Sequence, residues 1–70
     1  LFSKGQKYKA WEKQKGICPK TGKLIPEGEI FNEEKWHADH IVPHSKGGKT
    51  TQDNCQLVDA NWNLKKYFIH

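Results

Sequence analysis

The chain has 70 residues, 34% of them hydrophobic, and a formal net charge of +4. That length allows one small domain, which buries only about 60% of the surface of its unfolded chain. Three Trp, three Phe and two Tyr exclude a disordered chain of low hydrophobicity. The sequence contains no apolar run long enough for a membrane span, so we expect no membrane partner.

The two cysteines, Cys18 and Cys55, are too few for a disulfide framework. One bridge between them stays open as an alternative, but the expectation is a reduced, cytoplasmic protein in which Cys55 serves packing. Since the chain starts at Leu1 and contains no Met, we expect a domain cut from a longer protein. The other domains of that protein would then be its partners.

Charge is distributed unevenly along the chain. Residues 1–23 carry a net charge of +6, residues 27–39 carry −4 and residues 40–70 carry +2. Basic ends around an acidic centre fit a protein that binds a polyanion and holds a cation, although lysines that only solvate the surface would look the same. All the basic residues are Lys, so nucleic-acid contacts would be mainly to phosphates and weakly sequence-specific.

The first predicted element is a short helix over residues 4–16, within an N-terminal region of residues 1–16. Tyr8, Trp11 and Gln14 share one face of this helix, and lysines cover the other. The glycine at position 16 stands at the expected C-cap.

The rest of the chain predicts a knuckle-like region followed by two strands and a helix. Residues 17–35 contain Pro and Gly residues that indicate tight turns. Strands are expected at residues 36–42 and 55–58, joined by a polar loop over residues 43–54 that contains a Gly-Gly pair. A C-terminal helix follows, with Asp59 as its N-cap. The predicted class is α+β, with an N-terminal helix, two short antiparallel strands joined by a long loop, and a C-terminal helix.

The segment WHADHIVPH, residues 36–44, holds three of the four histidines, with Asp39 directly before His40. Either a structural zinc site or a hydrolytic site would explain this cluster. Structural zinc usually takes four Cys or His ligands in two close pairs, and neither cysteine has a second Cys three residues away. A mixed site of both cysteines and two histidines stays open, but it would need unusual geometry. Phosphodiester hydrolysis needs a base and a cation, which His40, Asp39 and Asn63 could supply.

Three segments, DHIVPHSKGG, DNCQL and NWNLKK, occur in this order between residues 39 and 66. Together they resemble the HNH endonuclease family, and the resemblance covers about residues 16–66. It implies a small ββα-metal fold, with a single domain over residues 1–70 and the ββα core at residues 36–66. With Asn at position 63, the chain would be an H-N-N version of the motif.

The resemblance implies a role for each of four residues. His40 would be the general base that activates water, and Asn54 would tie down the loop between the strands. Asp39 and Asn63 would bind one divalent cation. Mg²⁺ is the expected ion because it prefers oxygen ligands, and Mn²⁺, Ni²⁺ or Zn²⁺ could occupy the same site.

Further side chains around the motif are candidates for contacts with substrate phosphates, and these are His37, His44, Lys46, Lys49, Lys65 and Lys66. Simple exposure to solvent is the alternative for the lysines and for His37, and His37 could also be an extra metal ligand. In a regular strand, His37 and Asp39 share one face while His40 points to the other. Asp39 and His40 would therefore meet at one metal only if the strand end were twisted or bulged.

The sequence departs from the family pattern at its zinc knuckles. Many members carry two Cys-x-x-Cys pairs, of which only Cys18 is present here, while Thr21, Asp59 and Trp62 occupy the other three positions. We therefore expect no structural zinc. Apolar burial of Trp62 against the other two tryptophans would replace it.

These patterns predict a metal-dependent endonuclease that hydrolyses DNA phosphodiester bonds, one strand per site, through a His-activated water. RNA stays open as a substrate. A catalytically silent nucleic-acid-binding module of the same fold is the first alternative, and the intact set of motif residues argues against it. A zinc-stapled interaction domain is the second, and the missing cysteines argue against that.

Overall fold

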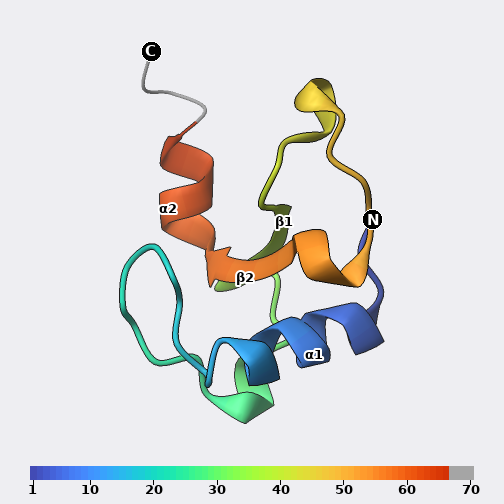
Figure 1. The fold of residues 1–70 in the computed structure, drawn as a ribbon. Coiled ribbons are helices and arrows are strands. Elements are labelled where there is room, and N and C mark those ends of the chain that lie inside the picture. The colour runs from blue at the N-terminus through green and yellow to red at the C-terminus, as the bar shows by residue number, and fades with distance from the viewer. Residues whose placement is uncertain (67–70) are drawn as a thin grey trace.

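The computed structural model describes residues 1–66, so the last four residues of the predicted domain and of its C-terminal helix lie outside the described part. The main elements are, in chain order, α1 (Lys4–Lys13), β1 (Trp36–His40), β2 (Cys55–Asp59) and α2 (Ala60–Lys65) (Figure 1). This order confirms the predicted α+β domain. No helix in residues 1–66 is long and apolar enough to cross a membrane.

Local signals define both ends of α1. The Ser3 hydroxyl accepts a hydrogen bond from the Gln6 N–H, and the Gln6 side chain accepts one from the Ser3 N–H, which is a complete capping box. The helix ends at Lys13, three residues before its predicted end. The reason is that Lys15 and Gly16 adopt positive φ angles of 56° and 72°, which are incompatible with a right-handed helix.

The two strands form an antiparallel pair whose register contains no bulge between residues 36 and 40. Directly paired residues lie on the same face of a sheet. One face therefore carries His37, Asp39, Gln56 and Val58, and the other carries Trp36, Ala38, His40, Cys55 and Leu57. β1 is two residues shorter than predicted, and β2 extends one residue further.

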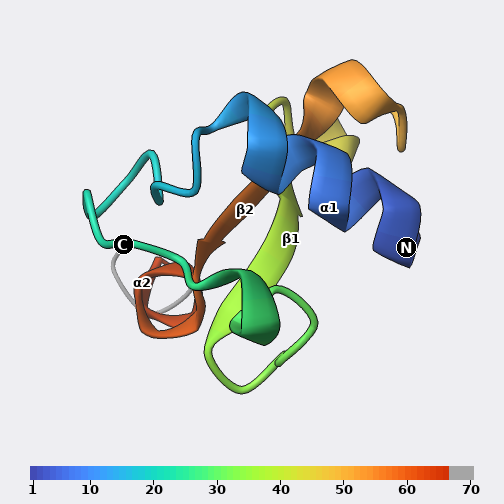
Figure 2. The same ribbon diagram turned by 90° about the horizontal axis from the view of Figure 1, so that it is seen from below.

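Gln14, at the C-terminal end of α1, covers the outer edge of β2. Its side chain accepts a hydrogen bond from the Leu57 N–H at 2.7 Å and donates one to the Leu57 carbonyl at 2.9 Å. These bonds satisfy backbone groups that an edge strand otherwise leaves open. In Figure 1, α1 runs beneath the sheet and α2 rises above it. Seen from below in Figure 2, α1 crosses one end of the strand pair and α2 lies at the other.

The main core lies between α1, the knuckle-like region and the strands. Its buried side chains are Cys18, Ile25, Ile30, Trp36, Leu57 and Val58, with Tyr8, Trp11 and Trp62 packed against them. All three tryptophans thus contribute to one core, as the sequence predicted. Cys55 belongs to a second, smaller cluster with Phe2 and Ala10. Burial there raises the pKa of the Cys55 thiol.

The first part of the knuckle-like region, residues 17–24, forms the predicted tight turn, and a 3-10 turn follows at Glu27–Glu29. Ile17 and Leu24 form a single β-bridge. Inside it, the Cys18 N–H donates to the Lys23 carbonyl at 2.8 Å and the Gly22 N–H donates to the Cys18 carbonyl at 2.9 Å. Gly22 has a φ of 75°, a conformation that glycine adopts without steric cost.

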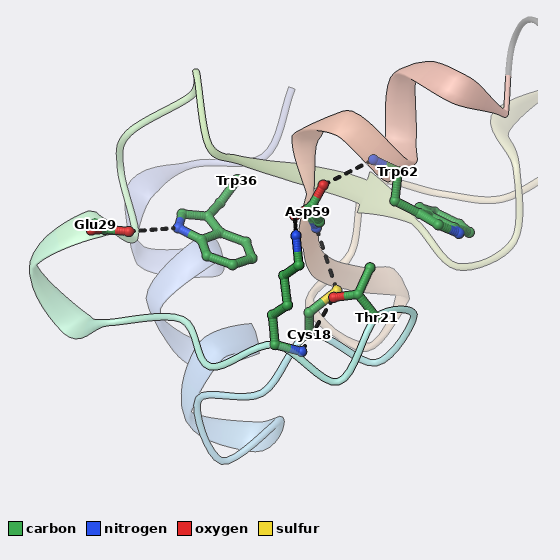
Figure 3. A network of polar contacts seen from close by, with 7 residues as sticks. Cys18, Thr21, Glu29, Trp36, Asp59 and Trp62 are labelled. Carbon is green, nitrogen blue, oxygen red and sulfur yellow. Dashed lines mark hydrogen bonds and ion pairs between the residues drawn. The ribbon is translucent and has the colours of Figure 1, made fainter.

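Asp59 connects β2, α2 and the knuckle-like region (Figure 3). Its carboxylate accepts a hydrogen bond from the Trp62 N–H at 2.9 Å, which confirms the predicted N-cap. The same carboxylate pairs with the Lys23 ammonium group at 3.2 Å, and the Asp59 N–H donates to the Cys18 sulfur at 3.4 Å. Because α2 starts directly after β2, these contacts determine where the helix begins.

The four positions at which the family pattern has knuckle cysteines lie together in Figure 3. They hold Cys18, Thr21, Asp59 and Trp62. Burial opposes ionisation of the Cys18 thiol, but hydrogen bonds from the Thr21 hydroxyl and from the Asp59 N–H outweigh this effect and lower its pKa. Hydrogen bonds and one ion pair therefore join the knuckle-like region to α2.

The substitution Asp59→Asn tests the contribution of the Asp59 carboxylate to this junction, because that contribution to the unfolding free energy should depend on pH. The Trp62 N–H lowers the pKa of Asp59, burial opposes this, and Lys23 lowers it further. A lowered pKa means that the carboxylate stabilises the fold above its unfolded-state pKa of about 3.9, and this contribution is lost as the pH falls. Asparagine still offers an oxygen to the Trp62 N–H but carries no charge for it or for Lys23, so the variant should lose about 1 kcal/mol of unfolding free energy at neutral pH.

Urea unfolding of wild type and Asp59→Asn measures this loss, and the difference between them should shrink between pH 5 and pH 2. Glu34→Gln, at an exposed carboxylate, serves as the control. A difference that stays constant across this pH range would contradict the assigned role of the carboxylate.

Candidate functional site

The predicted site residues lie at the end of β1, in the following loop and on α2. The loop runs from residue 41 to residue 54 and contains two 3-10 turns, His44–Lys46 and Gln52–Asn54. Asn54 closes this loop with its side-chain amide. Its oxygen accepts from the Val42 N–H at 2.8 Å, and its nitrogen donates to the carbonyls of Val42 at 3.1 Å and Lys49 at 2.8 Å.

The Gly-Gly pair is required by the path of this loop. Gly47 has a φ of 87° and ends the first 3-10 turn in the left-handed conformation. A Cβ atom on Gly48 would lie 1.8 Å from the Val42 carbonyl oxygen. The loop can therefore fold back onto residue 42 only if position 48 lacks a side chain.

Side chains of β1 and α2 contact each other at two points: Asp39 contacts Lys66, and His37 contacts Asn63. The Asp39 carboxylate is bound by the Lys66 ammonium group and, at 3.4 Å, by the Gln56 side-chain nitrogen. Lys66 follows Asn63 by three residues, so the two share one side of the helix. Asn63 is only 8% exposed, and its Nδ2 donates to Nδ1 of His37 at 3.0 Å.

Asn63 Oδ1 is buried and has no hydrogen-bond partner among the described residues. Leaving a buried polar atom unpaired costs about 1–3 kcal/mol, and a divalent cation is a ligand that would satisfy an amide oxygen. Asn63 and His37 also line a cavity of about 280 Å³. The unpartnered Asn63 oxygen thus fits a cation that prefers oxygen ligands. Asp39 does not line this cavity, and its carboxylate is paired with Lys66, which a cation bound at Asp39 would have to displace.

Two protein ligands are enough for Mg²⁺, which keeps several waters and takes further oxygens from substrate phosphates. Within residues 1–66, no three His, Cys, Asp or Glu side chains lie close enough to hold a metal among themselves. A cation at Asp39 and Asn63 would therefore complete its shell with water and substrate.

His40 lies on the opposite face of β1. Its Nε2 is 3.0 Å from the Thr50 hydroxyl, and its ring centroid lies 4.6 Å from that of Phe2 and 6.3 Å from that of His44. Because the strand end is regular, His40 and Asp39 point away from each other. The structure therefore places Asp39 on the face of β1 that meets α2, where Lys66 contacts Asp39 and Asn63 contacts His37. His40 lies on the other face, although His40 and Asp39 are neighbours whose Cα atoms are about 3.8 Å apart.

The predicted phosphate-contact residues fall into two groups. His37 and Lys66 are half-buried and contact the predicted metal ligands directly. The other four are exposed, and these are His44, Lys46, Lys49 and Lys65. Thr50 and Gln56, which contact His40 and Asp39, were not anticipated. Strand pairing would have indicated Gln56, whereas no sequence signal pointed to Thr50.

Comparisons with known proteins agree with the motif. Residues 16–67 match the family described as HNH endonuclease. The chain is also 33% identical over 66 residues to the type IV methyl-directed restriction enzyme EcoKMcrA of Escherichia coli (strain K12), a match that covers 86% of this chain and 22% of that enzyme. The chain thus spans about a fifth of the length of this relative. No solved structure matches significantly.

We expect Asn54→Ala to loosen the loop. The substitution removes three hydrogen bonds, including the acceptor of the Val42 N–H. Because the site is exposed and water can replace them, the loss should cost about 1 kcal/mol. Amide hydrogen exchange followed by NMR should be faster at Val42 in Asn54→Ala than in the wild type. Exchange at Ala10 in α1 should be the same in both. Asn61→Ala, at an exposed position of α2, is the matched control. Unchanged protection of the Val42 amide would show that Asn54 does not close the loop.

Proposed function

This chain belongs to the HNH endonuclease family, and from that premise we propose that it hydrolyses phosphodiester bonds in DNA, nicking one strand per site. Membership suggests nuclease activity, implies DNA as the substrate and points to a divalent metal ion, which the family generally uses. We propose Mg²⁺ as that ion because the candidate ligands are oxygen atoms.

The arrangement at the end of β1 is the observation that carries this proposal. His40 lies on one face of β1 and the Asp39 carboxylate lies on the other. On the Asp39 face, Asn63 contacts His37 and leaves its amide oxygen without a partner among the described residues. A phosphodiester lying across the strand end would meet both groups. This division suits hydrolysis, in which a base acts on the attacking water while a cation acts on the phosphate and the leaving oxygen.

His40 would take the proton from the attacking water. The Thr50 hydroxyl at Nε2 and the Phe2 ring hold the imidazole in place. If Nε2 donates its proton to the Thr50 oxygen, Nδ1 is the nitrogen that accepts the proton from water. Asn54 would serve catalysis indirectly, because it holds the loop that carries Thr50.

Asp39 and Asn63 would hold the cation. When bound, the cation supplies stabilisation of the negative charge that develops on the phosphate and on the leaving 3′ oxygen. Lys66 already contacts the Asp39 carboxylate, so its ammonium group lies where a phosphate could reach it.

DNA contacts outside the reacting phosphate would be largely electrostatic. The exposed candidates for them are His44, Lys46, Lys49 and Lys65. Because the basic side chains are lysines, binding should fall steeply with salt and discriminate little between sequences. The relative is a methyl-directed restriction enzyme, and we propose that any comparable target selection depends on partner domains rather than on this site.

We also propose a reducing, cytoplasmic setting. Cys18 and Cys55 are both free thiols. Each is buried in a different apolar cluster, and Cys18 accepts hydrogen bonds at its sulfur. Both side chains therefore contribute to the fold without a bridge.

Nicking of supercoiled plasmid tests the proposed function. Conversion to open circle should require Mg²⁺ or Mn²⁺ and stop with EDTA. His40→Ala should lower the rate by about 10²–10⁴-fold, the usual contribution of general acid–base catalysis. Asp39→Asn should also impair nicking because it weakens cation binding. His70→Ala removes a histidine from outside the motif and is the matched control.

A folded wild type that binds DNA and leaves it intact with both metals would contradict the proposed hydrolysis. That result would favour the alternative of a catalytically silent nucleic-acid-binding module. Nicking that persists in His40→Ala would instead show that another group activates the water.

A further inference from the structure

We propose that His37 is a positioning residue: Nδ1 of His37 accepts a hydrogen bond from Asn63 and thereby leaves the Asn63 amide oxygen as the atom offered to the cation. This inference rests on the proposed function, because it concerns a ligand of the proposed cation. It assigns to His37 a role other than contact with the substrate.

An asparagine ligand needs such a device. The oxygen and nitrogen of its amide are similar in size, so hydrogen bonds decide which of them points in a given direction. Only the oxygen can bind a cation, and the NH₂ group at the same place would repel one. Asn63 is 8% exposed, so its orientation depends on protein partners more than on water.

His37 is the partner that sets this orientation. The Asn63 Nδ2 lies 3.0 Å from the His37 Nδ1. An amide NH₂ group donates hydrogen bonds and cannot accept them, so in this amide orientation Nδ1 of His37 is the acceptor and the proposed tautomer carries its ring proton on Nε2. The other amide atom, Oδ1, is then left buried without a partner in the described part of the chain.

The fold explains why a histidine at position 37 reaches Asn63. His37 and Asp39 lie two residues apart on the same face of β1, about 6–7 Å apart along the strand. α2 starts directly after β2, and its fourth residue is Asn63. On this face, His37 would thus orient the amide of Asn63, and Asp39 would itself be a ligand of the proposed cation.

The ring tautomer of His37 gives a direct test without metal and without activity. Long-range ¹H–¹⁵N correlation on the ¹⁵N-labelled 70-residue chain should show a protonated Nε2 and an unprotonated Nδ1 for His37. A proton on Nδ1 would overturn the inference, because that nitrogen could not accept from Asn63.

Two variants test the consequence for cation binding. His37→Leu removes the acceptor at similar volume, whereas His37→Asn keeps an acceptor oxygen close to the position of Nδ1. Mn²⁺ affinity, measured by electron paramagnetic resonance, should fall about 10–100-fold in His37→Leu, the usual cost of losing a group that orients a ligand. His37→Asn should keep most of the affinity. Thermal unfolding without metal shows whether both variants are folded.

Equal loss of affinity in two folded variants, or no loss in His37→Leu, would overturn the inference. Should His37→Leu fail to fold, a loss of Mn²⁺ affinity of about 10–100-fold in a folded His37→Asn would also overturn the inference. A wild type that does not bind Mn²⁺ would overturn the proposed cation site, and the inference with it. A wild type that binds Mn²⁺ but does not nick DNA would count against the proposed hydrolysis alone.

Discussion

The junction at Asp59 is the constraint on which the candidate site depends. A two-stranded sheet and a helix of six described residues are each marginal by themselves, so tertiary contacts must set their relative position. Asp59 sets the position of α2 relative to the sheet, because it ends β2, caps α2 and contacts Lys23 and Cys18 of the knuckle-like region. The placement of Asn63 opposite β1 follows from where that cap starts the helix.

The alternation of side chains along β1 then divides the site. His37 and Asp39 project toward α2, and His40 projects to the other face beside Thr50. This division places the proposed base on the opposite face from the proposed cation ligand Asp39, so His40 would not compete for the proposed cation. Under the proposed function, one substrate phosphate at the end of the strand would reach both sets of groups. The loop closed by Asn54 lies at the same end.

Much of the fold could be predicted because its signals are local, such as the Asp59 cap and the alternating strands. The end of α1 was missed because Lys15 adopts a left-handed conformation that its residue type does not indicate. β1 was predicted too long because the Asn54 side chain takes both backbone groups of Val42. The motif residues were recognisable from their joint spacing, but the contact between His37 and Asn63 depends on strand register and helix placement.

The measurement that tests the central claim most directly is the site of cation binding in solution. Mn²⁺ added to the ¹⁵N-labelled chain broadens the NMR signals of nearby nuclei. We predict that broadening is strongest at Asp39, at the Asn63 side-chain amide and at the Gln56 side-chain amide. Broadening centred instead on the acidic segment from Glu27 to Glu34 would contradict the account. It would show that Asp39 and Asn63 do not form the cation site.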